Sequence, residues 1–229
     1  MQTGVGVDMV GRYFKDNGLT IALIFIFTIC LVGMVWTGWL DENSMLRDHG
    51  RGPITVSAYF LSSAFQSALF ENWESEFLQM SAYVIMTALL FQRGSSESKD
   101  PDKTNPEDAD PADERRAKQA PWPVRAGGVW SAFYSYSLGI CLLLLFAGSF
   151  FLHWLHSARA ANEDAILHDE ATQTVLQYLM DPHLWFESFQ NWQSEFLSTA
   201  ILVVLSIVLR YRGSPESKAV ADPHSKTGH

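Results

Sequence analysis

A nine-residue polar motif occurs twice in this sequence, and each copy precedes an apolar run. The first copy, residues 70–78, reads FENWESEFL, and the second, residues 189–197, reads FQNWQSEFL, at an offset of 119 residues. Both apolar runs have similar endings, RGSSESK at 93–99 and RGSPESK at 212–218. Further identities keep the same offset without a gap: Asn43 with Asn162, His49 with His168, and Tyr59 with Tyr178. A repeat this wide predicts two copies of one structural unit.

Apolar residues are concentrated in long uncharged blocks, although their overall share of 48% is ordinary. Residues 19–40 carry no formal charge, and about 20 such residues cross the roughly 30 Å of a hydrocarbon core. A secretory signal peptide is the alternative for this block, but its apolar part would be shorter, about 7–15 residues. We therefore predict a retained transmembrane helix here, and further spans at about 72–92, 129–155 and 191–211.

These blocks predict an all-α polytopic membrane protein with four transmembrane helices, arranged as two parallel two-helix repeats. Residues 56–70 are too short to span and too apolar for a free loop, so we expect an interfacial or partly inserted helix. Residues 100–125 are rich in charge and proline, which favours a disordered linker. The expected order is N-terminal segment, repeat 1, linker, repeat 2 and tail, at 1–18, 19–99, 100–125, 126–218 and 219–229.

The basic residues predict an orientation. With a cytoplasmic N-terminus, 13 of the 16 lysines and arginines fall on the cytoplasmic side, and only Arg47, Arg51 and Arg159 fall on the other. Loops rich in lysine and arginine stay on the cytoplasmic side of a membrane. We therefore expect a multi-pass protein of a cytoplasmic (inner) membrane with both termini in the cytoplasm. Its two repeats then enter from the same side, related by an axis along the membrane normal.

A candidate polar centre lies in the repeated motif. Asn72 and Glu76 are four residues apart and share a helical face, as do Asn191 and Glu195. The symmetry axis could bring the two carboxylates together, where they would bind a cation or share a proton. Alternatively, these groups only cap and anchor the helix starts. Glu76 lies 17 residues before Arg93, or about 25 Å along a helix, which places it at the outer edge of the hydrocarbon.

Other motif residues have structural interpretations. Trp73 and Trp192 are expected to anchor the helices at the membrane interface. His49 and His168 could join the glutamates in a metal site, but their spacing matches no metal motif, so none is predicted. The Arg-Gly pairs at 93–94 and 212–213 are typical of a helix end with a glycine cap and a basic last turn.

Two further histidines argue against a paired haem site. His153 and His156 lie near the end of the third apolar block, and Met34 and Thr37 stand at the corresponding positions of the first repeat. We find no phosphate-binding glycine loop, nucleophile elbow, zinc-protease motif or CxxC pair. No enzyme activity, cofactor or nucleic-acid partner is therefore predicted. The lipid bilayer is the expected partner, together with a second copy or another membrane protein.

The doubled FxNWxSEFL motif with its RGSxESK ending resembles a family of bacterial integral membrane proteins of unknown function. The resemblance covers residues 12–99 and 129–218, and it implies a bacterial multi-spanning membrane protein without an assigned activity. Between the two copies of the motif, Glu71 and Glu74 of the first correspond to Gln190 and Gln193 of the second. Ion or small-solute handling at the outer leaflet is the first functional hypothesis. A non-catalytic scaffold is the second, and a metal- or haem-binding redox protein is the third.

Overall fold

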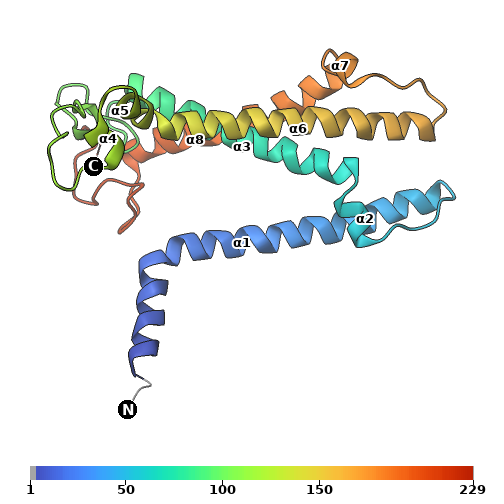
Figure 1. Cartoon of the computed structure of the whole chain (residues 1–229), viewed down its shortest axis with the longest axis horizontal. Coiled ribbons are helices and arrows are strands. Elements are labelled where there is room, and N and C mark those ends of the chain that lie inside the picture. The colour runs from blue at the N-terminus through green and yellow to red at the C-terminus, as the bar shows by residue number, and fades with distance from the viewer. Residues whose placement is uncertain (1–3, 229) are drawn as a thin grey trace. The chain divides into compact units, whose positions relative to one another are not determined.

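The computed structural model describes residues 4–228, with side chains described from residue 12 onward. All regular elements in this part of the chain are helical, which confirms the predicted all-α class. Residues 1–3 of the expected N-terminal segment and residue 229 of the expected tail lie outside the described residues. The elements are α1 Gly4–Asp48, α2 Val56–Phe60, α3 Ser63–Leu89, η1 Pro106–Asp108, α4 Trp122–Ala126, α5 Gly128–Ser135, α6 Ser137–Leu167, α7 Val175–Tyr178 and α8 Pro182–Val208 (Figure 1).

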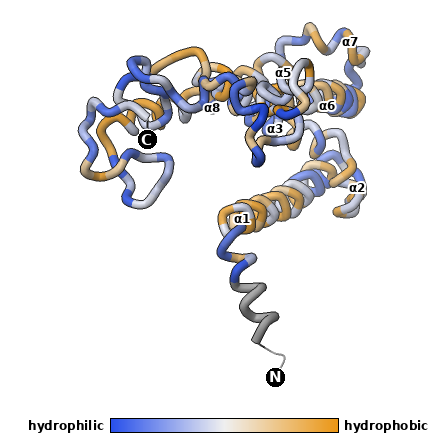
Figure 2. Tube along the Cα trace, turned by 60° about the vertical axis from the view of Figure 1, so that its left-hand side comes forward, coloured by the Kyte–Doolittle hydropathy of each residue, from blue (hydrophilic) through white to orange (hydrophobic). Residues whose placement is uncertain are grey.

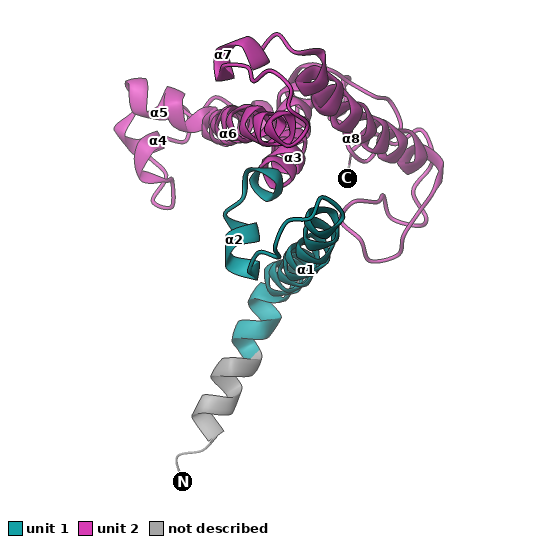
Figure 3. Ribbon diagram, turned by 90° about the vertical axis from the view of Figure 1, so that its right-hand side faces the viewer, with its two compact units in different colours: residues 1–66 teal, residues 67–229 magenta. Residues whose placement is uncertain are grey.

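The chain divides into two compact units, residues 1–66 and residues 67–229 (Figure 3). The boundary falls inside α3, close to its N-terminus. Unit 1 therefore contains α1, α2 and the first turn of α3. Unit 2 contains the remainder of α3 and all the later helices.

Within the described part of the chain, three helices are long and apolar enough to cross a membrane, instead of the predicted four: α1 from Arg12 onward, α6 and α8. Figure 2 shows the apolar character of the middle part of α1. The span expected at 72–92 falls in α3, which does not qualify. Acidic residues are strongly unfavourable in a membrane helix, and the first half of α3 contains three of them, Glu71, Glu74 and Glu76.

Two expected helices are divided in the structure. The apolar block at 129–155 is shared between α5 and α6, which are separated at Tyr136. The segment 56–70 is shared between α2 and the start of α3. Local capping accounts for the start of α2, because the Thr55 hydroxyl accepts a hydrogen bond from the backbone N–H of Ala58.

The loop after α1 is closed by an asparagine, and so is the loop after α6. Asn43 donates to the carbonyl of Ile54 and accepts from its N–H, at 3.2 and 2.7 Å. Asn162 makes the same two bonds with Gln173, both at 2.7 Å. Both residue pairs are 11 apart, and the second is offset from the first by 119 positions. The same clasp thus shapes the corresponding loop in each half of the sequence.

In unit 2, α3 and α8 run toward the same end of the unit, and hydrogen bonds join them (Figure 1). Near one end, the Asn191 amide donates to the Glu71 carboxylate. Further along, the Gln79 amide donates to the Thr199 hydroxyl at 2.6 Å. Both contacts join residues 120 positions apart. A constant register of this kind requires two parallel helices in lateral contact.

The RGSxESK endings fold back on the helices that precede them. α3 ends at Leu89, four residues before Arg93, so the expected cap of a basic last turn followed directly by glycine is absent here. Instead, the Lys99 ammonium donates to the carbonyl of Ala88 at 3.0 Å. Lys218 donates to Ile207 at the end of α8 in the same manner, at 3.3 Å. A lysine near free C-terminal carbonyls also complements the helix dipole.

The segment predicted to be a disordered linker consists mainly of turns in the structure, with the short η1 helix at Pro106–Asp108. Ion pairs join it to the segment that follows α3: Arg93 binds Asp102, and Lys99 binds Asp108. The pair of Arg93 with Asp102 is exposed, and exposed pairs contribute little to stability. The disorder of residues 100–125 in solution stays a prediction.

Candidate functional site

A buried histidine lies between two carboxylates in unit 2. His153 of α6 and Glu74 of α3 have fully buried side chains, and His153 Nδ1 is 2.9 Å from Glu74 Oε2. His153 Nε2 lies 3.4 Å from Glu187 Oε2 of α8. Burying ionisable groups carries a large desolvation cost, which only good pairing offsets. Each nitrogen of this imidazole therefore faces a carboxylate from a different helix. We call Glu74, His153 and Glu187 the central triad.

The outer carboxylate of the triad has its own set of partners. Glu187 Oε2 accepts a hydrogen bond from the Ser157 hydroxyl at 3.1 Å. That hydroxyl also lies 3.0 Å from the Tyr178 hydroxyl of α7. Glu187 Oε1 is 3.2 Å from Nε2 of His183, one helical turn earlier on α8. These contacts fix both oxygens of a side chain that is 23% exposed.

Glu74, the inner carboxylate of the triad, accepts a hydrogen bond from a side chain of α8. Trp192 Nε1 donates to Glu74 Oε1 at 3.2 Å. A third acid, Glu71, is held nearby by the amide of Asn191 and interacts electrostatically with the whole triad. Three carboxylates and one imidazole thus lie close together in this part of unit 2.

The triad lies at the edge of the apolar segments. His153 is two residues before the end of the apolar block at 129–155, and Glu74 lies three residues before the uncharged run at 77–91. Tryptophans of the repeated motif are found at the same level, which suits a membrane–water interface. Ionisable groups cost less at this depth than at the bilayer centre, but they still mark candidate functional sites.

The residues of the predicted centre are only partly brought together. Asn191 reaches the group through Glu71, whereas Asn72 is exposed and its amide donates to Ala68 of its own helix. Glu76 is exposed and Glu195 is half-buried, and the two carboxylates are close enough to interact electrostatically. A joint cation- or proton-binding role for Glu76 and Glu195 stays a prediction.

The expected anchors and metal candidates lie as follows. Trp73 packs edge-to-face against Phe70, while Trp192 has the additional bond to Glu74. His49 and His168 are exposed near helix ends, with Nδ1 close to backbone carbonyls one turn earlier. Among the described residues, no three His, Cys, Asp or Glu side chains converge in a way that could hold a metal ion.

The sequence contained a signal for the triad, and it was the difference between the copies. Glu74 corresponds to Gln193, His153 to Met34, and Glu187 to Ala68. Pairing between the copies instead predicts Glu76 and Glu195, which are equal in both. The buried ionisable groups instead occupy positions where the copies differ. No sequence rule places these three residues together, because their contacts depend on how α3, α6 and α8 pack.

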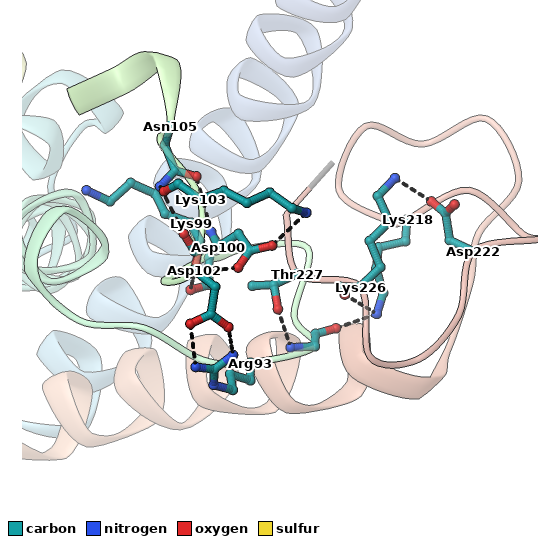
Figure 4. Close-up of polar contacts among 12 residues, drawn as sticks. Arg93, Lys99, Asp100, Asp102, Lys103, Asn105, Lys218, Asp222, Lys226 and Thr227 are labelled. Carbon is teal, nitrogen blue, oxygen red and sulfur yellow. Dashed lines mark hydrogen bonds and ion pairs between the residues drawn. The ribbon is translucent and has the colours of Figure 1, made fainter. Parts of the chain in front are cut away.

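A second polar cluster joins the two RGSxESK endings to the C-terminal tail (Figure 4). The buried Lys218 ammonium donates to the carbonyls of Gly94, His224 and Lys226. Loss of hydration lowers the pKa of Lys218, and the nearby charge of Arg210 lowers it further. Thr227 accepts a hydrogen bond from the N–H of Gly94 at 2.9 Å. This cluster, which we call the tail clasp, fixes the ends of α3 and α8 together.

Comparison with curated proteins and with solved structures finds no match. The family described as Domain of unknown function (DUF6766) matches residues 10–229, which include every helix of unit 2 and the whole central triad. The chain therefore belongs to this family.

Proposed function

We propose that this chain is a multi-pass membrane protein whose central triad binds a proton during the handling of a small ion or solute. The observation that carries the proposal is the fully buried imidazole of His153 between Glu74 and Glu187. Imidazole exchanges protons near neutral pH and can do so at either nitrogen. A site with an acceptor on both sides of that ring is suited to receiving a proton from one side and releasing it to the other.

A purely structural role for the triad is less well supported. The loop after α1 forms the same asparagine clasp as the loop after α6, although Met34 stands where the second copy has His153. The unit therefore folds locally without the ionisable set. Buried ion pairs often contribute no net stability compared with apolar residues of similar size. Retaining the triad in one copy thus favours a functional use.

The repeat and the course of α3 form part of the proposal. Equivalent clasps at Asn43 and Asn162, and equivalent lysine contacts at the two helix ends, support two copies of one unit. Although α3 is too polar to qualify as a span by itself, it runs parallel to α8 with its acidic residue Glu74 covered. We propose that α3 crosses the membrane together with α8. Both termini then lie in the cytoplasm of a bacterial cell, as the distribution of basic residues favours.

Proton flux in proteoliposomes tests the proposed function. A trapped pH-sensitive dye reports proton entry when valinomycin and a potassium gradient impose a membrane potential. We expect purified wild-type protein to raise the rate above that of protein-free vesicles. His153→Gln and Glu74→Gln should return the rate to background, because each removes a proton-exchanging group. A folded His153→Gln variant with the wild-type rate would contradict the proposal.

The matched control separates the two candidate centres. Glu76→Gln combined with Glu195→Gln removes the acids that are equal in both copies and leaves the triad intact. We expect this double variant to keep the wild-type flux, with monodispersity in detergent confirming its fold. If the Glu76 and Glu195 double variant abolished flux while the triad variants kept it, the centre would lie at Glu76 and Glu195. If the wild-type protein gave only background flux while the triad variants lowered stability, a scaffold role would replace the proposal.

A further inference from the structure

A row of proton-exchanging groups leads from the surface of unit 2 to its interior. The side chain of His183 is 64% exposed, that of Glu187 is 23% exposed, and that of His153 is fully buried. Successive members lie 3.2 and 3.4 Å apart, and Glu74 follows His153 at 2.9 Å. Acids and imidazoles alternate along this row. Exposure falls at each step until the interior is reached.

We infer that His183 and Glu187 form the route by which protons pass between water and the buried His153, an inference that rests on the proposed function. His183 takes a proton from water at Nε2 and gives it to Glu187 Oε1. Rotation of the carboxyl group presents that proton to Nε2 of His153. The imidazole then releases its Nδ1 proton to Glu74 Oε2. His183, Glu187 and His153 each gain one proton and lose one, and the transferred proton ends on Glu74, so no other reactant is needed.

The structure contains one open position in this row, at His153 Nε2. This atom is buried and has no well-aligned hydrogen-bond partner among the described residues, although Glu187 Oε2 is only 3.4 Å away. A buried nitrogen without a partner is costly and calls for an explanation. A small movement of the Glu187 carboxyl would close this contact. The open position therefore lies between the surface half and the buried half of the route, where transfer is controlled.

Ser157 and Tyr178 position the carboxylate that must move. The Ser157 hydroxyl holds Glu187 Oε2 from one side and meets Tyr178 on the other, at 3.1 and 3.0 Å. In the first copy, Gly38 stands at the position of Ser157 and Tyr59 at that of Tyr178. A Cβ on Gly38 would lie 2.1 Å from the Tyr59 hydroxyl, so Tyr59 would have to move to admit a serine there. The serine is thus specific to the copy that carries the row.

Several other titratable groups interact electrostatically with the row and contribute to its pH dependence. They are Glu71 on α3, Tyr178 on α7 and Asp181 at the start of α8. None of them continues the sequence of short contacts from His183 to Glu74. They set the electrostatic environment, whereas the row provides the transfers.

The test replaces the exposed histidine and leaves the triad complete. We expect His183→Gln to lower the proton flux in the vesicle assay by about 100-fold, the scale of one lost acid–base group. His168→Gln is the matched control, because His168 is also exposed and pairs with an acid four residues away, Asp164, at 3.5 Å. That pair is not part of the row, so the control should keep the wild-type rate.

Chemical rescue distinguishes a proton-transfer role from a structural one. Millimolar imidazole in the buffer should restore flux to His183→Ala, because a diffusing base can take the place of the missing side chain. It should not restore Glu187→Gln, which blocks the next step inside the protein. Failure of imidazole to restore His183→Ala, or an unchanged flux in His183→Gln, would overturn the route.

A separate measurement tells failure of the route from failure of the proposed function. NMR of protein with ¹⁵N-labelled histidine, in nanodiscs, reports whether His153 itself binds and releases a proton as the pH changes. If His153 titrates and the wild type conducts, but His183→Gln is unaffected, the route is wrong and the central triad stands. If His153 does not titrate and the wild type does not conduct, the proposed function fails and the route fails with it.

Discussion

At the scale of single residues, His153 and Glu74 are each other's main compensation for burial. Both side chains are fully buried, and the contact between them is 2.9 Å. Removing one partner from a buried ion pair leaves the other charge without compensation, which costs more than the pair itself contributes. The consequence is an asymmetry between single and double substitutions that can be measured.

Glu74→Leu should lower the free energy of unfolding by about 3–5 kcal/mol, because it leaves His153 buried opposite an apolar side chain. Glu74→Leu with His153→Leu should lose less than the single variant, since both charged groups are then removed. Reversible unfolding in mixed micelles measures both values. Gln193→Leu, the exposed equivalent in the second motif, serves as the control and should change stability little. A double variant less stable than either single one would contradict this account.

The identity of these residues explains why the sequence does not predict the site. Glu76 and Glu195 form the predicted pair because both copies contain them. Equality between copies is well explained by the needs of the shared unit, such as helix starts and loop clasps. A residue required by only one copy has no counterpart. The sequence shows that Met34 stands in the first copy where the second has His153. Only the packing of the helices shows that His153 contacts Glu74.

At the scale of helices, the RGSxESK ending is a device that closes a helix from beyond its last turn. Ser98 accepts a hydrogen bond from the N–H of Gln92, and Ser217 does so from Tyr211, both at 2.9 Å. Gly94 and Gly213 have φ of 86° and 88°, values that a residue with a side chain rarely adopts. A helix end near these glycines could be predicted from the sequence. The reach of the lysines back to the final carbonyls could not, because it depends on this fold-back turn.

Lys218→Met tests the tail clasp. The ammonium group contacts four backbone carbonyls, and methionine keeps most of the side-chain volume without donating to any of them. Hydrogen bonds from charged groups contribute about 1.5–3 kcal/mol each, and orphaned carbonyls add a cost. We expect faster amide hydrogen exchange in residues 219–228, measured by mass spectrometry. Arg212→Met, at an exposed position, should leave that exchange unchanged; equal exchange in both variants would mean that Lys218 does not hold the tail.

At the scale of the whole molecule, hydropathy and helix contacts give different information about the four expected membrane helices. Hydropathy selects α1, α6 and α8, because it counts each residue as if it faced lipid. The acidic Glu74 of α3 instead faces His153 and Trp192, so its charge is compensated by protein. The sequence could predict the class and three of the four expected spans. It could not decide the fourth, because a helix shielded by its neighbours has no requirement to be apolar throughout.

Single-cysteine labelling decides the course of α3. In a background with Cys30 and Cys141 changed to alanine, Gly52→Cys marks the loop after α1, Lys118→Cys the linker, and Ala171→Cys the loop after α6. If α3 crosses with α8, a membrane-impermeant maleimide added outside spheroplasts labels positions 52 and 171, and position 118 reacts only after lysis. If α3 does not cross, positions 52 and 118 react from the same side. If only α1, α6 and α8 crossed, the linker would lie outside. The parallel contact of α3 with α8 instead requires both helices to end on the same side of the membrane, which places the linker inside.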